Sequence, residues 1–136
     1  MGDTGLLVTR LLKGSREDLY QSLIFGSLGI NEGIIMENAV AQMLRAAGHE
    51  LYFHEYTYKA GDKKTEQKYE IDFLITRKRK VCQIEVKSSG YIRHDSFDFF
   101  IKKYPINVED RFILYTKDLA YKDGITYLPL YMTMFL

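Results

Sequence analysis

The spacing of apolar residues first predicts a helix. From Asn31 onward, apolar residues recur every three or four positions, and Gly48 follows the last of them. This stripe consists of Met36, Val40, Met43, Leu44 and Ala47. The period is that of an amphipathic helix, and glycine commonly follows the last turn of one. We therefore expect a helix that runs from Asn31 and stops at Gly48.

After Gly48 the period shortens to two, which predicts strands. Residues 51–58, 69–76 and 81–88 are rich in aromatic and β-branched side chains. The polar residues 59–68 separate the first two segments as a loop, and the basic turn 77–80 joins the second and third. The pattern predicts a three-stranded unit whose last two strands form a hairpin.

The rest of the chain predicts helices on either side of this unit and further strands behind it. A second helical stripe, ended by Pro105, consists of Phe97, Phe100, Ile101 and Tyr104. Residues 111–116 and 125–130 predict two more strands, and residues 1–28 a helical segment packed on the core. The order αβββαβ predicts an α/β fold, in which a mixed sheet is flanked by helices.

Pairing of the hairpin strands is predicted by their apolar residues. With a turn of two or four residues, the facing apolar pairs are Ile75 with Cys82, Phe73 with Ile84, and Ile71 with Val86. All of them share one face of the sheet, as a side-chain period of two requires. The other face then carries Asp72 opposite Glu85 and Glu70 opposite Lys87.

Two carboxylates directly opposite each other repel unless something compensates their charge. A divalent cation between Asp72 and Glu85 would do so, and oxygen ligands without a His or Cys cluster favour Mg²⁺ or Mn²⁺ over Zn²⁺. Lys87 lies on the same face, where it could orient or deprotonate a water and stabilise a phosphoryl group. The alternative interpretation of these charges is a surface ladder of salt bridges.

Glu37 is a fourth candidate, because it lies on the apolar stripe of the predicted helix. A buried carboxylate needs a partner or a metal. The alternative is that Glu37 interacts favourably with the helix macrodipole. Tyr52, Tyr56 and Tyr58 likewise leave two interpretations open, stacking on bases or packing in a core.

Composition narrows the class of protein. The 136 residues, 46% of them hydrophobic, are enough for one domain, 1–136. With a net charge of +1, affinity for nucleic acid has to come from local clusters such as the basic turn 77–80, unless that turn is merely solvated. The single cysteine, Cys82, falls on the apolar hairpin face as an inert thiol. No signal peptide or membrane span is evident, which predicts a cytoplasmic protein.

The ordered set of candidate residues resembles the PD-(D/E)XK nuclease-like superfamily. The resemblance rests on Glu37, the segment 70–73 (EIDF) and the segment 84–90 (IEVKSSG). It is most similar to the C-terminal domain of unknown function attached to bacterial and archaeal P-loop ATPases of the AAA type. Further similarity lies in residues 3–7, 33–40 and 128–130, so most of the chain is covered.

This resemblance implies a restriction-endonuclease-like core and a site. Asp72 and Glu85 would bind the metal with the backbone carbonyl of Val86, Lys87 would be the catalytic lysine, and Glu37 the helix-borne acid. Ile71 stands where the superfamily name has proline. The chain has no phosphate-binding loop ending in Gly-Lys-Ser or Gly-Lys-Thr, so it should not hydrolyse ATP by itself.

Two functions follow as hypotheses. The first is a Mg²⁺- or Mn²⁺-dependent phosphodiesterase that cleaves nucleic acid, DNA rather than RNA. The second is a non-catalytic nuclease-fold module that binds nucleic acid or a protein partner and regulates an attached ATPase. A purely structural oligomerisation domain is a third option, and the sequence leaves the oligomeric state open, a homodimer included.

Overall fold

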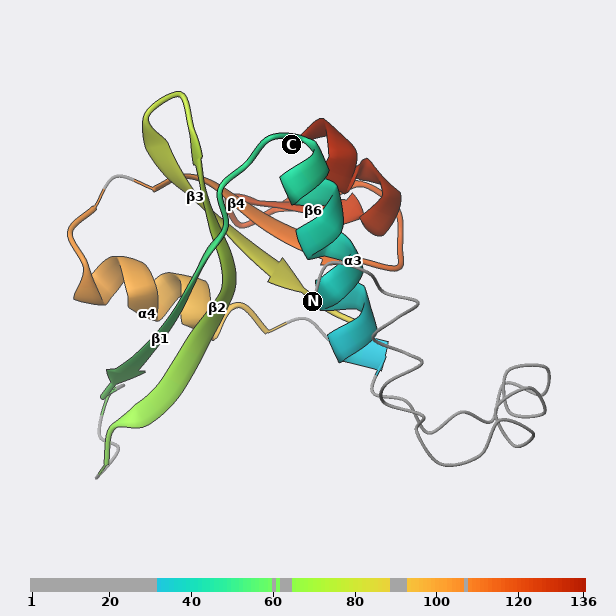
Figure 1. Ribbon diagram of the computed structural model, residues 1–136. Coiled ribbons are helices and arrows are strands. Elements are labelled where there is room, and N and C mark those ends of the chain that lie inside the picture. Colours follow the sequence, from blue (N-terminus) through green and yellow to red (C-terminus); the bar gives the residue numbers. More distant parts are fainter. Residues whose placement is uncertain (1–31, 60, 62–64, 89–92, 107) are drawn as a thin grey trace, which may run out of the picture.

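The structure is a computed structural model that describes residues 32–59, 61, 65–88, 93–106 and 108–136 (Figure 1). These residues form one six-stranded mixed sheet with helices on both faces, which confirms the predicted α/β class. The predicted helical segment 1–28 and its packing on the core lie outside the described residues.

The elements follow the predicted order with two additions near the end. They are α3 (Glu32–Ala46), β1 (Tyr52–Tyr58), β2 (Gln67–Arg77), β3 (Lys80–Val86), α4 (Asp95–Lys103), β4 (Val108–Tyr115), β5 (Ala120–Lys122), β6 (Ile125–Pro129) and the 3-10 helix η1 (Leu130–Phe135). The strands lie in the order β1-β2-β3-β4-β6-β5. The β3–β4 and β4–β6 pairs are parallel, and the other pairs are antiparallel. The connection from β3 to its parallel neighbour β4 contains α4, as a crossover requires.

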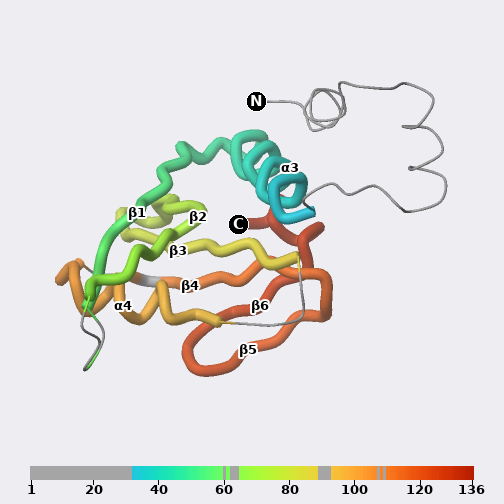
Figure 2. The backbone as a smooth tube through the Cα atoms, turned by 90° about the horizontal axis from the view of Figure 1, so that it is seen from below, coloured from blue at the N-terminus to red at the C-terminus, as the bar shows by residue number. Residues whose placement is uncertain are grey.

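The sheet separates two hydrophobic cores of different composition. In Figure 2, α3 lies on one side of the sheet and α4 on the other. The core on the α3 side is largely aliphatic and contains Val40, Leu44, Ile75, Cys82, Ile84, Val86, Phe112, Leu114 and Leu128. The core on the α4 side is largely aromatic and contains Tyr56, Ile71, Phe97, Phe100, Ile113, Tyr115, Ile125 and Tyr127.

Helix α3 ends where the sequence predicts. Gly48 has a φ of 93°, a left-handed conformation that side chains with a Cβ disfavour. The amide of His49 donates to the carbonyl of Leu44 at 3.0 Å, and that of Gly48 donates to Arg45 at 3.0 Å, so the last carbonyls are satisfied. Val40 and Leu44 from the predicted stripe are fully buried against the sheet.

The tip of the β2–β3 hairpin also agrees with the sequence. Lys78 and Arg79 form a two-residue turn, and both have positive φ values, 48° and 66°. This is the geometry of a type I′ turn, whose twist matches that of the strands. The predicted pairs Ile75 with Cys82 and Phe73 with Ile84 are confirmed.

At the open end of the hairpin the predicted register is wrong. Tyr52 of β1 pairs with Leu74, whereas His54 pairs with Ile71, so β2 carries one extra residue in this interval. Such a bulge reverses the faces on which the following residues lie. Ile71 consequently lies in the core on the α4 side, and Val86 in the core on the α3 side. The paired residues of β2 and β3 end at Phe73, so Asp72 with Glu85 and Glu70 with Lys87 are not ladder pairs.

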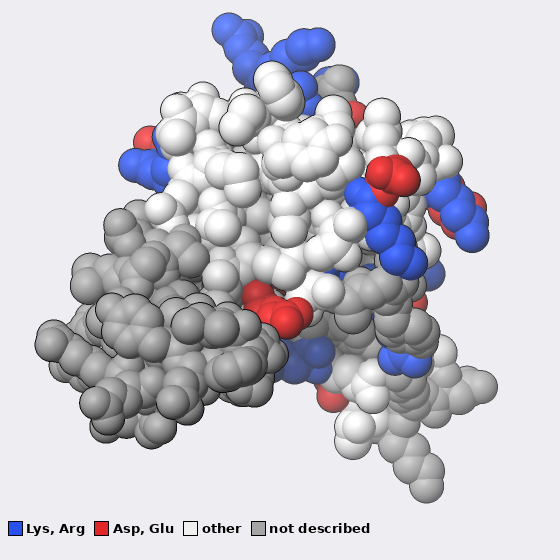
Figure 3. All heavy atoms as spheres, turned by 90° about the vertical axis from the view of Figure 1, so that its right-hand side faces the viewer, with Lys and Arg blue, Asp and Glu red and all other residues white. Residues whose placement is uncertain are grey.

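Two C-terminal elements were not predicted. Strand β5 has three residues, all exposed, so it shows no alternation of apolar and polar positions. The 3-10 helix η1 starts at Leu130, which the sequence had placed in the preceding strand. It packs against α3, yet Tyr131, Met134 and Phe135 stay exposed. Figure 3, viewed from the side of α3 and η1, shows a largely uncharged face.

Within the described ranges, the helices are too short or too polar for any of them to span a lipid bilayer.

Candidate functional site

The four candidate side chains come together at one end of the sheet. Glu37 lies in the first half of α3, Asp72 in the bulged part of β2, Glu85 near the end of β3, and Lys87 just beyond it. The charges of Asp72 and Lys87 both act on the pKa of Glu37 and on that of Glu85. We call these four side chains the charged cluster.

Glu85 is the most deeply buried member of the charged cluster. Its residue is 1% exposed. The Lys87 Nζ atom lies 2.9 Å from Glu85 Oε2, and the Ser96 hydroxyl donates to Glu85 Oε1. Burial raises the pKa of Glu85 to about 7 and Asp72 adds to the rise, although Lys87 and His94 oppose it. The Glu85 carboxyl therefore holds its proton to higher pH than an exposed glutamate does.

Asp72 is held by the neighbouring strand. The backbone amide of Val86 donates to Asp72 Oδ2 at 2.7 Å. Burial raises the pKa of Asp72, while this hydrogen bond and the charge of Lys87 act against the rise. The bulge in β2 thus turns a carboxylate onto the end of β3, where the regular ladder has stopped.

Lys87 forms an ion pair with Glu85 and interacts electrostatically with Asp72 and Glu37. Its backbone amide donates to the Leu114 carbonyl of β4 at 2.8 Å, which holds the residue beside the sheet. Burial lowers its pKa, but Glu85, Asp72 and Glu37 outweigh burial, so the net pKa is raised. The Lys87 ammonium therefore stays protonated at neutral pH, and it cannot act as a base there.

Glu37, like Asp72, is a half-buried carboxylate of the cluster. Burial raises its pKa, Asp72 and Glu70 raise it further, and Lys87 lowers it. A macrodipole effect alone would lower the pKa of an acid near a helix N-terminus. The environment of the sheet end therefore outweighs the helix terminus at this residue.

The acidic charge of the cluster suits a divalent cation, but the arrangement of its side chains is not that of a formed metal site. The three carboxylates all have raised pKa values, because burial disfavours their charged forms and the single Lys87 ammonium does not offset this. Oxygen donors suit Mg²⁺ or Mn²⁺. However, Ser96 donates to Glu85 Oε1, and Glu85 Oε2, which accepts no hydrogen bond, forms an ion pair with Lys87. The described residues contain no group of three His, Cys, Asp or Glu side chains arranged around a metal position. A cation at Glu85 would have to share the carboxylate with Lys87.

The basic turn 77–80 is not part of the charged cluster. It lies at the start of β3, whereas Lys87 lies just beyond its end. At about 3.3 Å per residue, Lys78 and Arg79 at the tip of the turn lie about 25–30 Å from Lys87. A nucleic acid could contact both the turn and the charged cluster only if it were long enough to span this distance.

Of the three tyrosines for which the sequence left base stacking or core packing open, two pack within the protein. Tyr56 is 5% exposed, stacks on Tyr69 and donates its hydroxyl to the Ser96 carbonyl. Tyr58 stacks on Phe99 of α4. Only Tyr52 is exposed, and its hydroxyl donates to Glu50 at 2.8 Å. Cys82 is fully buried in the aliphatic core, as predicted.

Sequence reasoning missed three polar residues near the cluster. Ser96 lies in the first turn of α4, and nothing in its spacing links it to Glu85. His94, which precedes α4, acts on the pKa of Glu85. Gln83 is fully buried, and its side-chain nitrogen and oxygen have no hydrogen-bond partner among the described residues. The period of two puts Gln83 on the same face as Glu85, which was the available signal.

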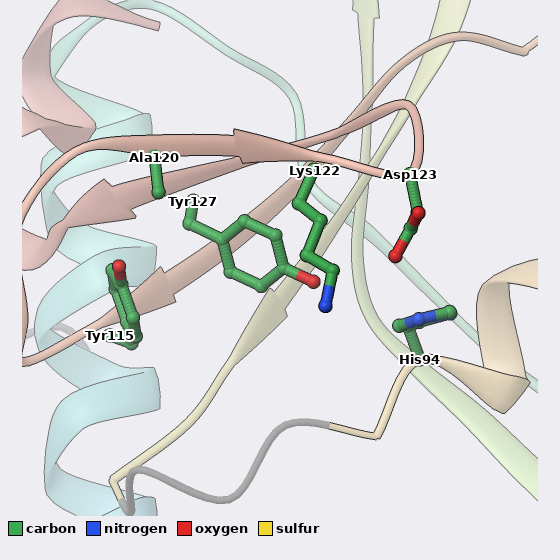
Figure 4. Close-up of a pocket in the computed structure, with 6 residues that line it drawn as sticks. All are labelled: His94, Tyr115, Ala120, Lys122, Asp123 and Tyr127. Atoms are coloured by element: carbon green, nitrogen blue, oxygen red, sulfur yellow. The ribbon is translucent and has the colours of Figure 1, made fainter.

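A small pocket opens beside this end of the sheet. It has a volume of about 240 Å³ and lies between the start of α4 and the β5–β6 hairpin, lined by His94, Tyr115, Ala120, Lys122, Asp123 and Tyr127. Figure 4 shows the ends of Lys122, Asp123 and Tyr127 turned toward the space that His94 borders.

Comparison with known proteins identifies one family. The sequence model described as "Domain of unknown function (DUF4143)" matches residues 32–133, from the start of α3 into η1. No curated protein and no solved structure matches the chain.

Proposed function

The chain belongs to the DUF4143 family, and because the description of this family states no function, we propose one from the charged cluster itself. It is a nuclease-type phosphodiesterase that acts on nucleic acid with Mg²⁺ or Mn²⁺. The observation that carries the proposal is the set of contacts in the cluster: Lys87 Nζ lies 2.9 Å from Glu85 Oε2, and the Val86 amide holds Asp72 beside them at 2.7 Å. The raised pKa values of Glu37, Asp72 and Glu85 agree with this arrangement.

The arrangement of elements supports a restriction-endonuclease-like topology, which is also part of the proposal. A helix that carries an acid precedes an antiparallel three-stranded unit, and a helical crossover then leads to a parallel strand. Asp72 on the second strand and Glu85 and Lys87 at the third match the residues that the PD-(D/E)XK resemblance implies. Strand β5 and the 3-10 helix follow this unit.

Asp72, Glu85 and the backbone carbonyl of Val86 are the groups that would hold the cation. When bound, it would supply positive charge against the phosphate oxygens and lower the pKa of a water. Lys87, protonated at neutral pH, stabilises the negative charge that develops on the phosphoryl group. The sequence also allowed Lys87 to deprotonate a water, but its raised pKa does not favour this role.

Glu37 is the cluster member that we assign to proton transfer. It is half-buried and therefore reachable by solvent, and its raised pKa makes its carboxylate a stronger base. Its carboxylate accepts the proton of the attacking water. The water oxygen bonds to phosphorus, the bond to the leaving oxygen breaks, and a solvent proton neutralises that oxygen.

A cleavage assay on single- and double-stranded DNA and RNA, with Mg²⁺ or Mn²⁺ and with EDTA, tests the proposal. Asp72→Asn keeps the side-chain shape but weakens cation binding, so it should abolish both cleavage and the Mg²⁺-dependent rise in melting temperature. Glu37→Gln should lower the cleavage rate by about 10²- to 10⁴-fold while the melting-temperature response to Mg²⁺ remains.

Lys117→Ala is a matched control for lysine substitutions, since Lys117 is exposed and lies outside the cluster. Lys87→Ala should lower turnover, and Lys117→Ala should not. Cleavage that persists in both Asp72→Asn and Lys87→Ala comes from a contaminant and contradicts the proposal. Absence of cleavage with every substrate and both metals contradicts it as well.

The second candidate function is a nuclease-fold module without turnover, which binds nucleic acid or a protein and regulates an attached ATPase. One observation favours it: Glu85 already has Ser96 at one oxygen and Lys87 at the other. Nucleic-acid binding that is unchanged by EDTA, together with no cleavage, would select this function over the first.

A further inference from the structure

The pocket lies between the start of α4 and the β5–β6 hairpin, and charged side chains link these two elements. His94 Nδ1 lies 3.2 Å from Asp98 Oδ2, and Arg111 Nη1 donates to Asp98 Oδ1 at 2.9 Å. Arg111 Nη2 also donates to the Asp123 carbonyl at 3.1 Å. Asp98 and Arg111 therefore connect the His94 wall to the β5–β6 turn. A pocket held in this way is largely formed before any ligand arrives.

The pocket and the charged cluster share the first turn of α4. His94 precedes the helix and lines the pocket, while Ser96, two residues later, donates to Glu85 in the cluster. A ligand in the pocket thus lies next to the proposed cleavage site. Lys122 projects into the same space as the Tyr127 hydroxyl (Figure 4).

Size and chemistry limit what the pocket can hold. Its 240 Å³ is below the range of about 300–1,000 Å³ usual for drug-sized ligands, so it suits one flat ring system with its substituents rather than a base pair. The His94 ring offers a stacking surface, while Tyr127 is buried except for its hydroxyl end. The Asp123 carboxylate accepts hydrogen bonds from a base amino group, and Lys122 offers a cation to a phosphate.

We propose that this pocket receives one unpaired nucleotide of the nucleic-acid strand that is cleaved. The inference rests on the proposed function for its choice of ligand. The preferred substrate is consequently single-stranded, or is a duplex with a nucleotide that can leave the stack. Base stacking on an aromatic ring strengthens binding about tenfold, which is enough to distinguish an exposed base from a paired one.

Fluorescence anisotropy in EDTA tests the pocket without cleavage. The full chain is titrated against a labelled single-stranded DNA of twelve nucleotides and against the duplex of the same sequence. We expect affinity for the single strand to exceed that for the duplex about tenfold. Lys122→Ala should weaken single-strand binding about tenfold, because a charged contact is lost. The matched control Lys117→Ala should leave the affinity unchanged.

A second variant separates recognition from general affinity. Asp123 has a φ of 54°, a conformation that asparagine tolerates, so Asp123→Asn keeps the turn. It replaces an acceptor-only carboxylate with an amide. The ratio of affinities for the four homopolymers should change several-fold, with the melting temperature unchanged.

Each outcome has a defined meaning. Equal affinity for duplex and single strand, or equal effects of Lys122→Ala and Lys117→Ala, overturns the pocket assignment. Nucleoside monophosphates that bind as tightly as the strand also overturn it, because the pocket would then hold a free nucleotide. A cleavage rate that is the same in Lys122→Ala and in the wild type contradicts this inference but not the proposed function. Pocket-dependent binding that Asp72→Asn leaves intact, with no wild-type cleavage in Mg²⁺, contradicts the proposed function alone.

Discussion

The two faces of the sheet differ in chemistry although they share the same strands. Toward α3, β3 presents Cys82, Ile84 and Val86, all in an aliphatic core. Toward α4, it presents Gln83 and Glu85, both fully buried under an aromatic core. Buried polar groups cost free energy unless they are satisfied. The α3 face therefore contributes stability, whereas the α4 face gives up stability at Gln83 and at Glu85, and Glu85 is a residue that the proposed function uses.

The largest effect should come from the aliphatic face. Leu44→Ala removes a fully buried side chain of α3 and leaves a cavity, which should lower the free energy of unfolding by about 2–5 kcal/mol. Chemical denaturation measures this loss. Ile34→Ala on the same helix is the control, since Ile34 is 42% exposed and should cost about 1 kcal/mol or less. Equal losses at the two positions would show that α3 does not bury this face as described.

On the α4 face, stability should depend on pH through Glu85. Its pKa is raised from 4.5 to about 7 on folding, so the folded state binds more protons between these values and is destabilised as the pH rises. The contribution is fully present below pH 4.5 and is lost through pH 7. It amounts to about 3 kcal/mol at most. Glu37 and Asp72, with raised pKa values, add a slope of the same sign at lower pH.

Denaturation at pH 5, 6, 7 and 8 in EDTA measures this slope. Glu85→Gln should flatten it between pH 5 and 7, and Glu66→Gln, at an exposed position, should leave it as in the wild type. A wild-type stability that rises over this interval would contradict the assignment of a raised pKa to Glu85.

Gln83 provides the third test of the same comparison. Leucine has a similar volume and no polar atoms, so Gln83→Leu should raise the free energy of unfolding by about 1–3 kcal/mol, the cost of an unsatisfied buried polar group. Thermal and urea denaturation both report this gain. A decrease in stability would show instead that Gln83 has a hydrogen-bonded role on this face, such as holding a buried water.

The sequence predicts those features of the structure that depend on residues adjacent in the chain. It does not predict features that depend on contacts between separate elements. The α3 stop and the hairpin tip depend on neighbouring residues, Gly48 and the turn at Lys78, and both were predicted. The bulge that separates Ile71 from Val86 depends on how β1 pairs with β2, which the hairpin pattern alone does not contain. The contact of Ser96 with Glu85 joins residues on different elements and left no spacing signal. Whether the candidate site residues act as assigned stays a prediction.

The smallest effect is expected at the hairpin tip, which both faces share. Lys78 and Arg79 occupy left-handed conformations that cost a residue with a Cβ about 1 kcal/mol each. Asparagine and glycine are the residues that a type I′ turn favours. Lys78→Asn combined with Arg79→Gly should therefore raise the free energy of unfolding by about 1 kcal/mol, measured by denaturation at fixed ionic strength.

The opposite substitution supplies the control for the tip, and the cleavage assay separates the tip from the site. Lys78→Val places a β-branched side chain at a φ of 48°, so it should destabilise the protein. Because the tip lies about 25–30 Å from Lys87, cleavage of a short oligonucleotide should be the same in both turn variants and in the wild type. If cleavage of a short substrate falls with the loss of Lys78 and Arg79 while stability rises, the tip contacts the substrate, and the separation drawn between tip and cluster is wrong.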